Sequence, residues 1–128
     1  MSVLNRIRDT LTTLAAGDVK MEGVWYGACQ EKKLENWNYF VFNRLKTTKN
    51  NTSKVDYQTF YQVHIVHEDY IPEGYVQTVI DALVTQDASG TKLKPTNDDV
   101  TYNYTFKGNT NMVVEIATIT LYHPEKRC

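Results

Sequence analysis

The segment 55–68 constrains the fold more than any other part of this sequence, because it reads as a strand with two apolar faces. A strand sends successive side chains to opposite faces of its sheet. Both faces of this segment are partly apolar, so we predict a strand in the middle of a sheet. One predicted face carries Tyr57, Thr59, Tyr61, Val63 and Ile65, and the other carries Gln58, Phe60, Gln62, His64 and Val66.

Other segments rich in aromatic and β-branched residues predict the neighbouring strands. They are residues 37–44 before the central strand, and residues 102–106 and 112–122 after it. Gly108-Asn109 predicts a tight turn between the last two, and Pro124 is expected to end the final strand. Val24-Trp25-Tyr26 fits either a short strand or an extended loop.

The N-terminal segment predicts an amphipathic helix that ends at Gly17-Asp18. Its apolar residues recur at the spacing of three and four that places them on one helix face. They are Val3, Ile7, Leu11 and Leu14, while the opposite face carries Asn5, Arg6, Asp9 and Thr13.

A second amphipathic helix is predicted to begin at Pro72, with Glu73 in its first turn, where a carboxylate suits the helix dipole. The apolar residues Val76, Val79, Ile80 and Leu83 repeat at helical spacing, and Ser89-Gly90 follows the helix.

These elements predict an α+β fold in which a mainly antiparallel sheet of four to five strands packs against two helices. The expected order is α-(β)-β-β-α-β-β, with the short strand in brackets. At 128 residues and 14.8 kDa the chain fits a single domain, residues 1–128, with a protruding polar loop around residues 45–54.

The distribution of charge says more than its total. The formal net charge is −1, which argues against a general binder of nucleic acid or anionic membranes. Residues 55–90 contain no Lys or Arg. This segregation fits solvated faces that differ by chance, or a surface that meets another copy head to tail. The basic residues around the polar loop are Arg44, Lys46, Lys49 and Lys54, and the acidic residues after it are Asp56, Glu68, Asp69, Glu73, Asp81 and Asp87.

Residues that could carry catalysis do not form a recognisable motif. The sequence has no G-x-S-x-G, no P-loop and no G-x-G-x-x-G. His64 and His67 lie three apart on a predicted strand, which sends them to opposite faces. His67-Glu68-Asp69 is a better cluster for a hard cation, although such a strand end is more often a solvated turn. We therefore expect no enzyme, no metal and no cofactor.

Two further features bear on location. No apolar run is long enough to span a bilayer, and no secretory leader is recognisable, so we expect a chain made in the cytoplasm and not bound to a membrane. Cys29 and Cys128 are too few for a disulfide scaffold, and the sequence leaves their redox state open.

The order of elements, together with four segments, resembles a family of viral structural proteins. The segments are NYFVFNR, YQTFYQVHIVHED, PEGYVQTVIDAL and VEIATITLYHPEK. In this order they are similar to the tail terminator and related head–tail connection proteins of long-tailed bacteriophages. The resemblance covers nearly the whole chain as a pattern of elements.

The resemblance implies a structural role in the virion tail, assembled in the cytoplasm of the bacterial host. Such proteins form a ring, commonly a hexamer, that caps the tail tube and offers a surface to the head connector, while DNA only passes through the lumen. The implied partners are further copies of the chain, the tail tube protein and a head-completion or connector protein. Arg44, Lys46, Lys49 and Lys54 would contact a neighbour or the tube end, and Glu68, Asp69, Glu73 and Asp81 would line the lumen or an interface.

Three other functions stay open at this point. The chain could be a neighbouring connector or neck protein, or a small metal-dependent enzyme with His67, Glu68 and Asp69 as ligands. A monomeric binding module would use a tyrosine-rich surface. Its candidate residues are Tyr57, Tyr61, Tyr70, Tyr75, Tyr102 and Tyr104.

Overall fold

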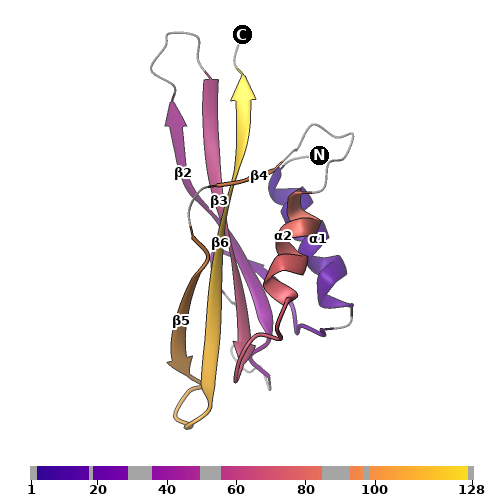
Figure 1. Cartoon of the computed structure of the whole chain (residues 1–128), viewed down its shortest axis with the longest axis vertical. Helices are drawn as coiled ribbons and strands as arrows, with labels where there is room; N and C mark the ends of the chain where they lie inside the picture. Colours follow the sequence, from indigo (N-terminus) through magenta and orange to yellow (C-terminus); the bar gives the residue numbers. More distant parts are fainter. Residues whose placement is uncertain are drawn as a thin grey trace.

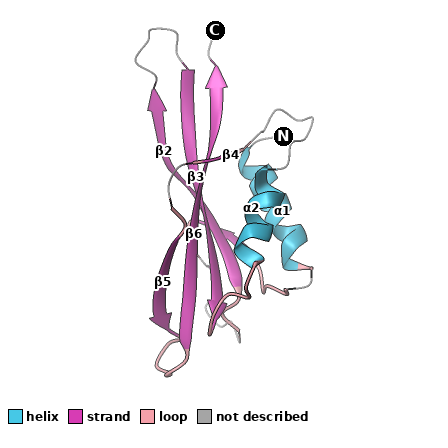
Figure 2. Cartoon of the chain, viewed as in Figure 1, coloured by secondary structure: helices cyan, strands magenta, loops and turns pink. Residues whose placement is uncertain are grey.

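The computed structural model describes residues 3–17, 19–28, 36–49, 56–84, 93–96 and 99–126, and it confirms an α+β fold. Two helices lie on one face of a strongly twisted sheet (Figures 1 and 2). In chain order the elements are α1 (Val3–Ala15), β1 (Val24–Tyr26), β2 (Tyr39–Lys49), β3 (Asp56–Glu68), α2 (Tyr75–Val84), β4 (Lys94–Pro95), β5 (Thr101–Phe106) and β6 (Val113–Lys126).

The sheet is built around β3 and β6. These two strands pair antiparallel without interruption from Asp56↔Lys126 to Glu68↔Val114. β2 pairs antiparallel with the other edge of β3, and β1 adds a short parallel pairing to β2. Both β4 and β5 pair with β6, so the described sheet has six strands and the order β1-β2-β3-β6-β4, with β5 also on β6. The central position predicted for β3 is confirmed.

The hydrophobic core lies between the helices and one face of this sheet. Val63 and Ile65 of β3 are fully buried there, as the alternation along this segment predicts. The helices contribute the residues expected from their spacing, including Ile7 and Leu11 of α1. The other core residues with less than 2% exposure are Phe40, Phe42, Val79, Leu83, Leu93, Ala117 and Leu121.

β2, β3 and β6 are much longer than the strands of an average domain. They contain 11, 13 and 14 residues, so β3 spans roughly 40 Å at the usual rise per residue. The ribbon that they form extends past the helices at the end of the molecule where the C-terminus lies (Figure 1). Residues 50–55, which follow β2, lie outside the described residues.

Two strand boundaries differ from the sequence-based expectation. Leu45 to Lys49 were predicted as part of a loop around residues 45–54, but they continue β2, because each threonine and lysine there finds a backbone partner on β3. Pro124 was predicted to end the last strand, yet β6 continues to Lys126. A proline is tolerated here because β4 pairs only with residues 121 and 122, so the missing N–H faces an edge.

Three further expectations are corrected. Arg6 was assigned to the exposed face of α1, but it is buried. Pro72 and Glu73 were placed in the second helix, but they precede it in a turn, and α2 begins at Tyr75. In this turn Gly74 has a φ of 83°, a left-handed conformation that glycine adopts readily, and the Tyr75 amide donates to the Pro72 carbonyl. The short strand β4 was not among the elements expected from the sequence, and with it the sheet has six strands where four to five were expected.

The aromatic packing of β2 on α2 gives a test of the core. Phe40 is fully buried, and its ring stacks on that of Tyr75 at 6.2 Å between centroids. We expect Phe40→Ala to lower the free energy of unfolding by roughly 3–5 kcal/mol, through lost burial and the cavity left behind. Chemical denaturation measures this change. Phe106→Ala is the matched control, because Phe106 is 58% exposed and its removal should cost less than about 1 kcal/mol. Equal losses for the two variants would contradict this assignment of the core.

Candidate interaction surfaces

The basic residues predicted at an interface lie on β2, beyond the region where β1 covers it. β1 pairs only with Phe40, Val41 and Phe42. Arg44 and Lys46 follow directly and are exposed. Lys49 is the last residue of β2, its side chain is outside the described set, and Lys54 lies outside the described residues altogether.

A β-bulge interrupts β2 at this point. The register with β3 shifts between Arg44 and Lys46, so Leu45 is the extra residue. The ammonium group of Lys46 lies 4.9 Å from the centroid of the Phe60 ring on β3. A bulge together with cationic side chains is a device by which proteins prevent an edge strand from pairing with an identical edge.

Glu68, one of the four predicted acidic residues, has a local structural role. It forms an ion pair with Lys107 and accepts a hydrogen bond from the Trp37 amide at 3.0 Å. Burial acts to raise the pKa of Glu68, but the hydrogen bonds from Lys107 and Trp37 and the nearby positive charge outweigh it and hold the pKa below its usual value. Its charge is therefore compensated within the subunit.

The other three predicted acidic residues are exposed but do not form one cluster. Asp69 directly follows β3 and has a φ of 63°, a left-handed conformation that few residues other than glycine adopt. Glu73 lies in the turn before α2, and Asp81 lies further along that helix, where it accepts a hydrogen bond from Gln77 at 2.8 Å.

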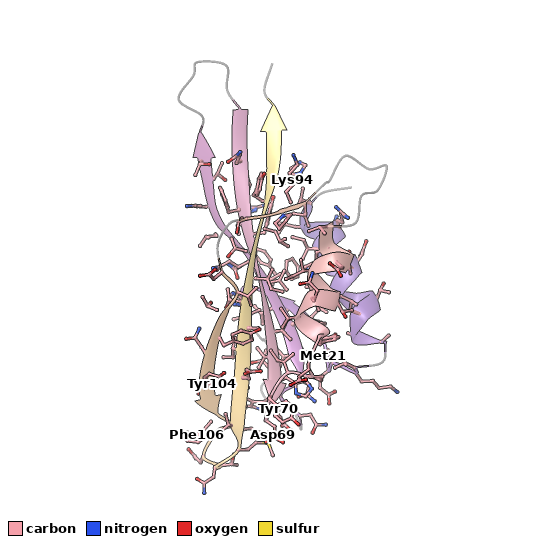
Figure 3. All side chains as sticks on the ribbon, viewed as in Figure 1. Met21, Asp69, Tyr70, Lys94, Tyr104 and Phe106 are labelled. Carbon is pink, nitrogen blue, oxygen red and sulfur yellow. The ribbon has the colours of Figure 1, made fainter. Side chains whose placement is uncertain are left out.

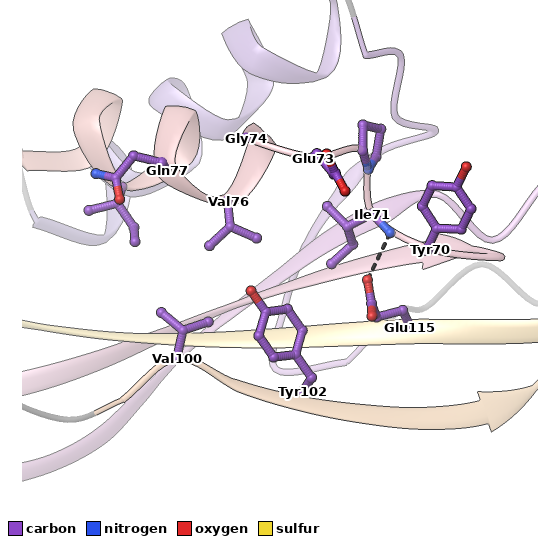
Figure 4. A pocket seen from close by; sticks show the side chains of 11 residues that line it. Tyr70, Ile71, Glu73, Gly74, Val76, Gln77, Val100, Tyr102 and Glu115 are labelled. Carbon is purple, nitrogen blue, oxygen red and sulfur yellow. Dashed lines mark hydrogen bonds between the residues drawn. The ribbon is translucent and has the colours of Figure 1, made fainter.

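The structure brings Glu73 together with residues that the sequence did not suggest. A pocket of about 640 Å³ lies between residues 70–74, α2 and the β5–β6 pair (Figure 4). Tyr102 points from β5 towards Val76 of α2 across this pocket. Of the described residues that line it, Glu73 and Glu115 are acidic and none is basic.

Glu115 is the principal residue that sequence reasoning missed. Its Oε1 atom accepts a hydrogen bond from the Ile71 amide at 2.9 Å, and its Oε2 atom accepts one from the Tyr104 hydroxyl at 2.9 Å. The bond to Glu115 raises the pKa of the Tyr104 hydroxyl. The available signal was that Glu115 is the one charged residue between Val113 and Tyr122 of this strand.

Exposed apolar side chains gather beside this pocket, at the β5–β6 end of the sheet (Figure 3). Every residue of β5 is exposed. Six of the eight large hydrophobic side chains exposed in the described residues belong to this region: Tyr70, Tyr102, Tyr104, Phe106, Met112 and Val113. By contrast, Tyr61 and Tyr75 of the proposed tyrosine surface are buried in the core, and the Tyr57 side chain is outside the described set.

The predicted cation cluster at the end of β3 is engaged in other contacts. His67 Nδ1 lies 2.8 Å from the backbone carbonyl of Glu68, and the Glu68 carboxylate binds Lys107. Within the described ranges, no group of three or more His, Cys, Asp and Glu side chains is placed to hold a metal ion. Cys29 and Cys128 lie outside those ranges.

A polar network crosses the sheet on the face away from the helices. His64 Nδ1 lies 2.9 Å from the Thr118 hydroxyl, and His64 Nε2 lies 2.9 Å from Asn43 Oδ1. The Asn43 side chain also donates to Gln62 at 3.2 Å. Burial lowers the pKa of His64, because the charged ring is poorly solvated there. The network thus joins β2, β3 and β6.

Comparisons with known proteins do not assign the chain to a family. No protein family matches the sequence, and no curated protein is found to be similar to it. Among the described helices, none is long and apolar enough to cross a membrane.

The His64 network predicts a specific dependence of stability on pH. The unfolded chain protonates near the ordinary pKa of 6.5, whereas the folded chain resists protonation of His64. The stabilisation that the neutral His64 ring gives the folded state is therefore fully present above pH 6.5. It is lost as the pH falls below that value, and the loss levels off below the lowered pKa of the folded state. Between about pH 7.5 and about pH 5, the free energy of unfolding measured with urea should fall less for His64→Gln than for the wild type. Equal losses in the two proteins would contradict the shift.

Proposed function

We propose that this protein is a structural subunit of a phage tail, which forms a ring that caps the tail tube and joins it to the head connector. The proposal rests on the resemblance in element order and on the surfaces described above. It makes the chain a component of the virion tail, assembled in the host cytoplasm.

The observation that carries the proposal is that two of the open edges of the described sheet differ in chemistry. β5 forms one edge and is uncharged from Thr101 to Phe106. Residues 43–49 of β2 form a second such edge beyond β1 and carry Arg44 and Lys46. A ring assembled head to tail needs two different, complementary surfaces on each subunit, whereas a two-fold dimer uses one surface twice.

The long ribbon of β2, β3 and β6 supports the same role. It extends past the helices (Figure 1), and therefore offers a surface for a second partner apart from the layer that contains the core. Arg44 and Lys46 lie on β2 beyond the residues that pair with β1. A ring that joins a tube to a connector has one face against the tube and another against the connector. We assign the ribbon to one of these two faces.

The exposed acidic residues suit a surface past which DNA moves without binding, or contact with a basic partner. Asp69, Glu73 and Asp81 are exposed, whereas Glu68 is paired with Lys107. Negative charge on a lumen repels the phosphate backbone and keeps DNA from binding there. We therefore place Asp81 at the lumen.

Electron microscopy with purified tail tubes tests the proposal. We expect tubes mixed with the protein to acquire a terminal ring and to stop elongating, because the ring covers the surface to which the next tube subunit would add. Tubes incubated without the protein are the control. Binding to head connectors without any effect on tubes would instead identify a neighbouring neck protein, and binding to neither would overturn the proposal.

A further inference from the structure

The backbone of β5 presents hydrogen-bonding groups to an open edge in phase with its aromatic side chains. Residue pairs in an antiparallel ladder alternate between bonded and non-bonded pairs. The Lys107 amide donates to the Met112 carbonyl at 2.9 Å, so the next pair, Phe106↔Val113, is non-bonded. Consistent with this phase, the Val113 carbonyl accepts from the Asp69 amide on the other side of β6.

The same alternation continues along β5. Tyr102, Tyr104 and Phe106 therefore direct their N–H and C=O groups away from β6, while Asn103 and Thr105 bond to it. The side chains of these three aromatic residues all project from one face and are 48–63% exposed. In the described part of the chain β5 pairs with β6 alone, so these backbone groups face an unoccupied edge.

This edge lacks the features that normally protect an exposed strand. From Thr101 to Phe106 β5 contains no charge, no proline and no register shift against β6. β2 has such features, because its open part carries a bulge, Arg44 and Lys46. An unprotected edge strand is a template for addition of another strand. The contrast indicates that β5 is open to pairing with another strand, whereas β2 is protected against pairing with a second basic edge.

The pocket beside β5 adds a charge preference. Tyr102 contributes both to the open edge and to the pocket wall, together with Glu73 and Glu115. Glu115 is held in place by the Ile71 amide and the Tyr104 hydroxyl, so its carboxylate is fixed before any partner arrives. Two carboxylates beside exposed aromatic rings favour a cationic side chain, through ion pairing and cation–π contact.

The open part of β2 has the matching properties. It covers residues 43–49 and β5 covers residues 101–106, so both edges are about 20 Å long. It supplies Arg44, whose planar guanidinium suits a carboxylate. Two β2 edges repel each other because both are basic. A β2 edge and a β5 edge do not repel each other, because β5 is uncharged.

We propose that the open edge of β5 binds residues 43–49 of a second copy as an added strand, with Arg44 of that copy beside Glu73 and Glu115. This inference rests on the proposed ring, and it names the contact through which subunits join head to tail. Each copy then uses its β5 edge for one neighbour and its β2 edge for the other.

A charge swap tests the contact between copies. Arg44→Glu and Glu73→Arg should each weaken assembly by about tenfold, and the double variant should recover most of that loss. Assembly is measured as mass by light scattering over a range of concentrations, and as the fraction of tail tubes with a ring. Lys20→Glu and Asp9→Arg are the matched controls, because both residues are exposed on the part of the chain around α1.

The outcomes separate this contact from the function. Rings that form normally with either single variant would overturn the β5–β2 contact and leave the ring intact. If both single variants assemble poorly and the double variant does not recover assembly, the pairing of Arg44 with Glu73 would be overturned. A wild type that forms neither rings nor caps would overturn the proposed function and the contact together.

A backbone substitution tests the role of the β5 edge itself. Tyr104→Pro removes an N–H that points to the edge and leaves those that bond to β6, so the protein should fold but assemble at least about tenfold less well. Tyr104→Val is the matched control, because it removes the same side chain and its bond to Glu115 while keeping the N–H. Equal assembly of the two variants would contradict strand addition at β5.

Amide exchange gives a measurement that needs no substitution. In the dilute monomer the amides of Tyr102, Tyr104 and Phe106 should exchange faster than those of Asn103 and Thr105, and assembly should protect them. If Tyr104→Pro blocks assembly while Arg44→Glu does not, β5 pairs with a different edge, such as β5 of a second copy. That result would overturn β2 as the occupant.

Discussion

The pairing of β3 with β6 is the constraint on which the rest of the structure depends. It runs without a register shift from Asp56↔Lys126 to Glu68↔Val114. Because side chains alternate with a period of two, this register sends Val63 and Ile119 to the helices and His64 and Thr118 to the opposite face. A slip by one residue would exchange the apolar and polar faces. The helices, the core and the polar network therefore all follow from one register.

The same pairing decides where the sheet ends. β3 also binds β2, and β6 also binds β5 along residues 113–118 and β4 at residues 121 and 122. The open edges of the described sheet include β2 beyond Phe42 and β5. These edges differ in chemistry because one carries Arg44 and Lys46 and the other is uncharged. The surfaces that we assign to assembly are thus the places where pairing stops.

Periodicity predicted the elements well where it was supported by apolar residues. The burial of Val3, Ile7 and Leu11 and the central position of β3 were expected from spacing alone. Prediction was weaker where polar residues form strands, as with Leu45 to Lys49. Lysine has little strand preference of its own, and the pairing with β3 keeps this segment in the strand. Pro124 was misplaced for a related reason, since its tolerance depends on which strand lies beside it.

The sequence by itself determined the α+β class, the central strand and the segregation of charge along the chain. Only the tertiary structure decided which charges remain available. Glu68 is compensated by Lys107, and Glu115 meets the Ile71 amide 44 residues away along the chain. Likewise, the backbone N–H and C=O groups of the aromatic residues in β5 point to the open edge only because of the register between β5 and β6. Such contacts depend on strand order and register, and a local pattern of residues contains neither.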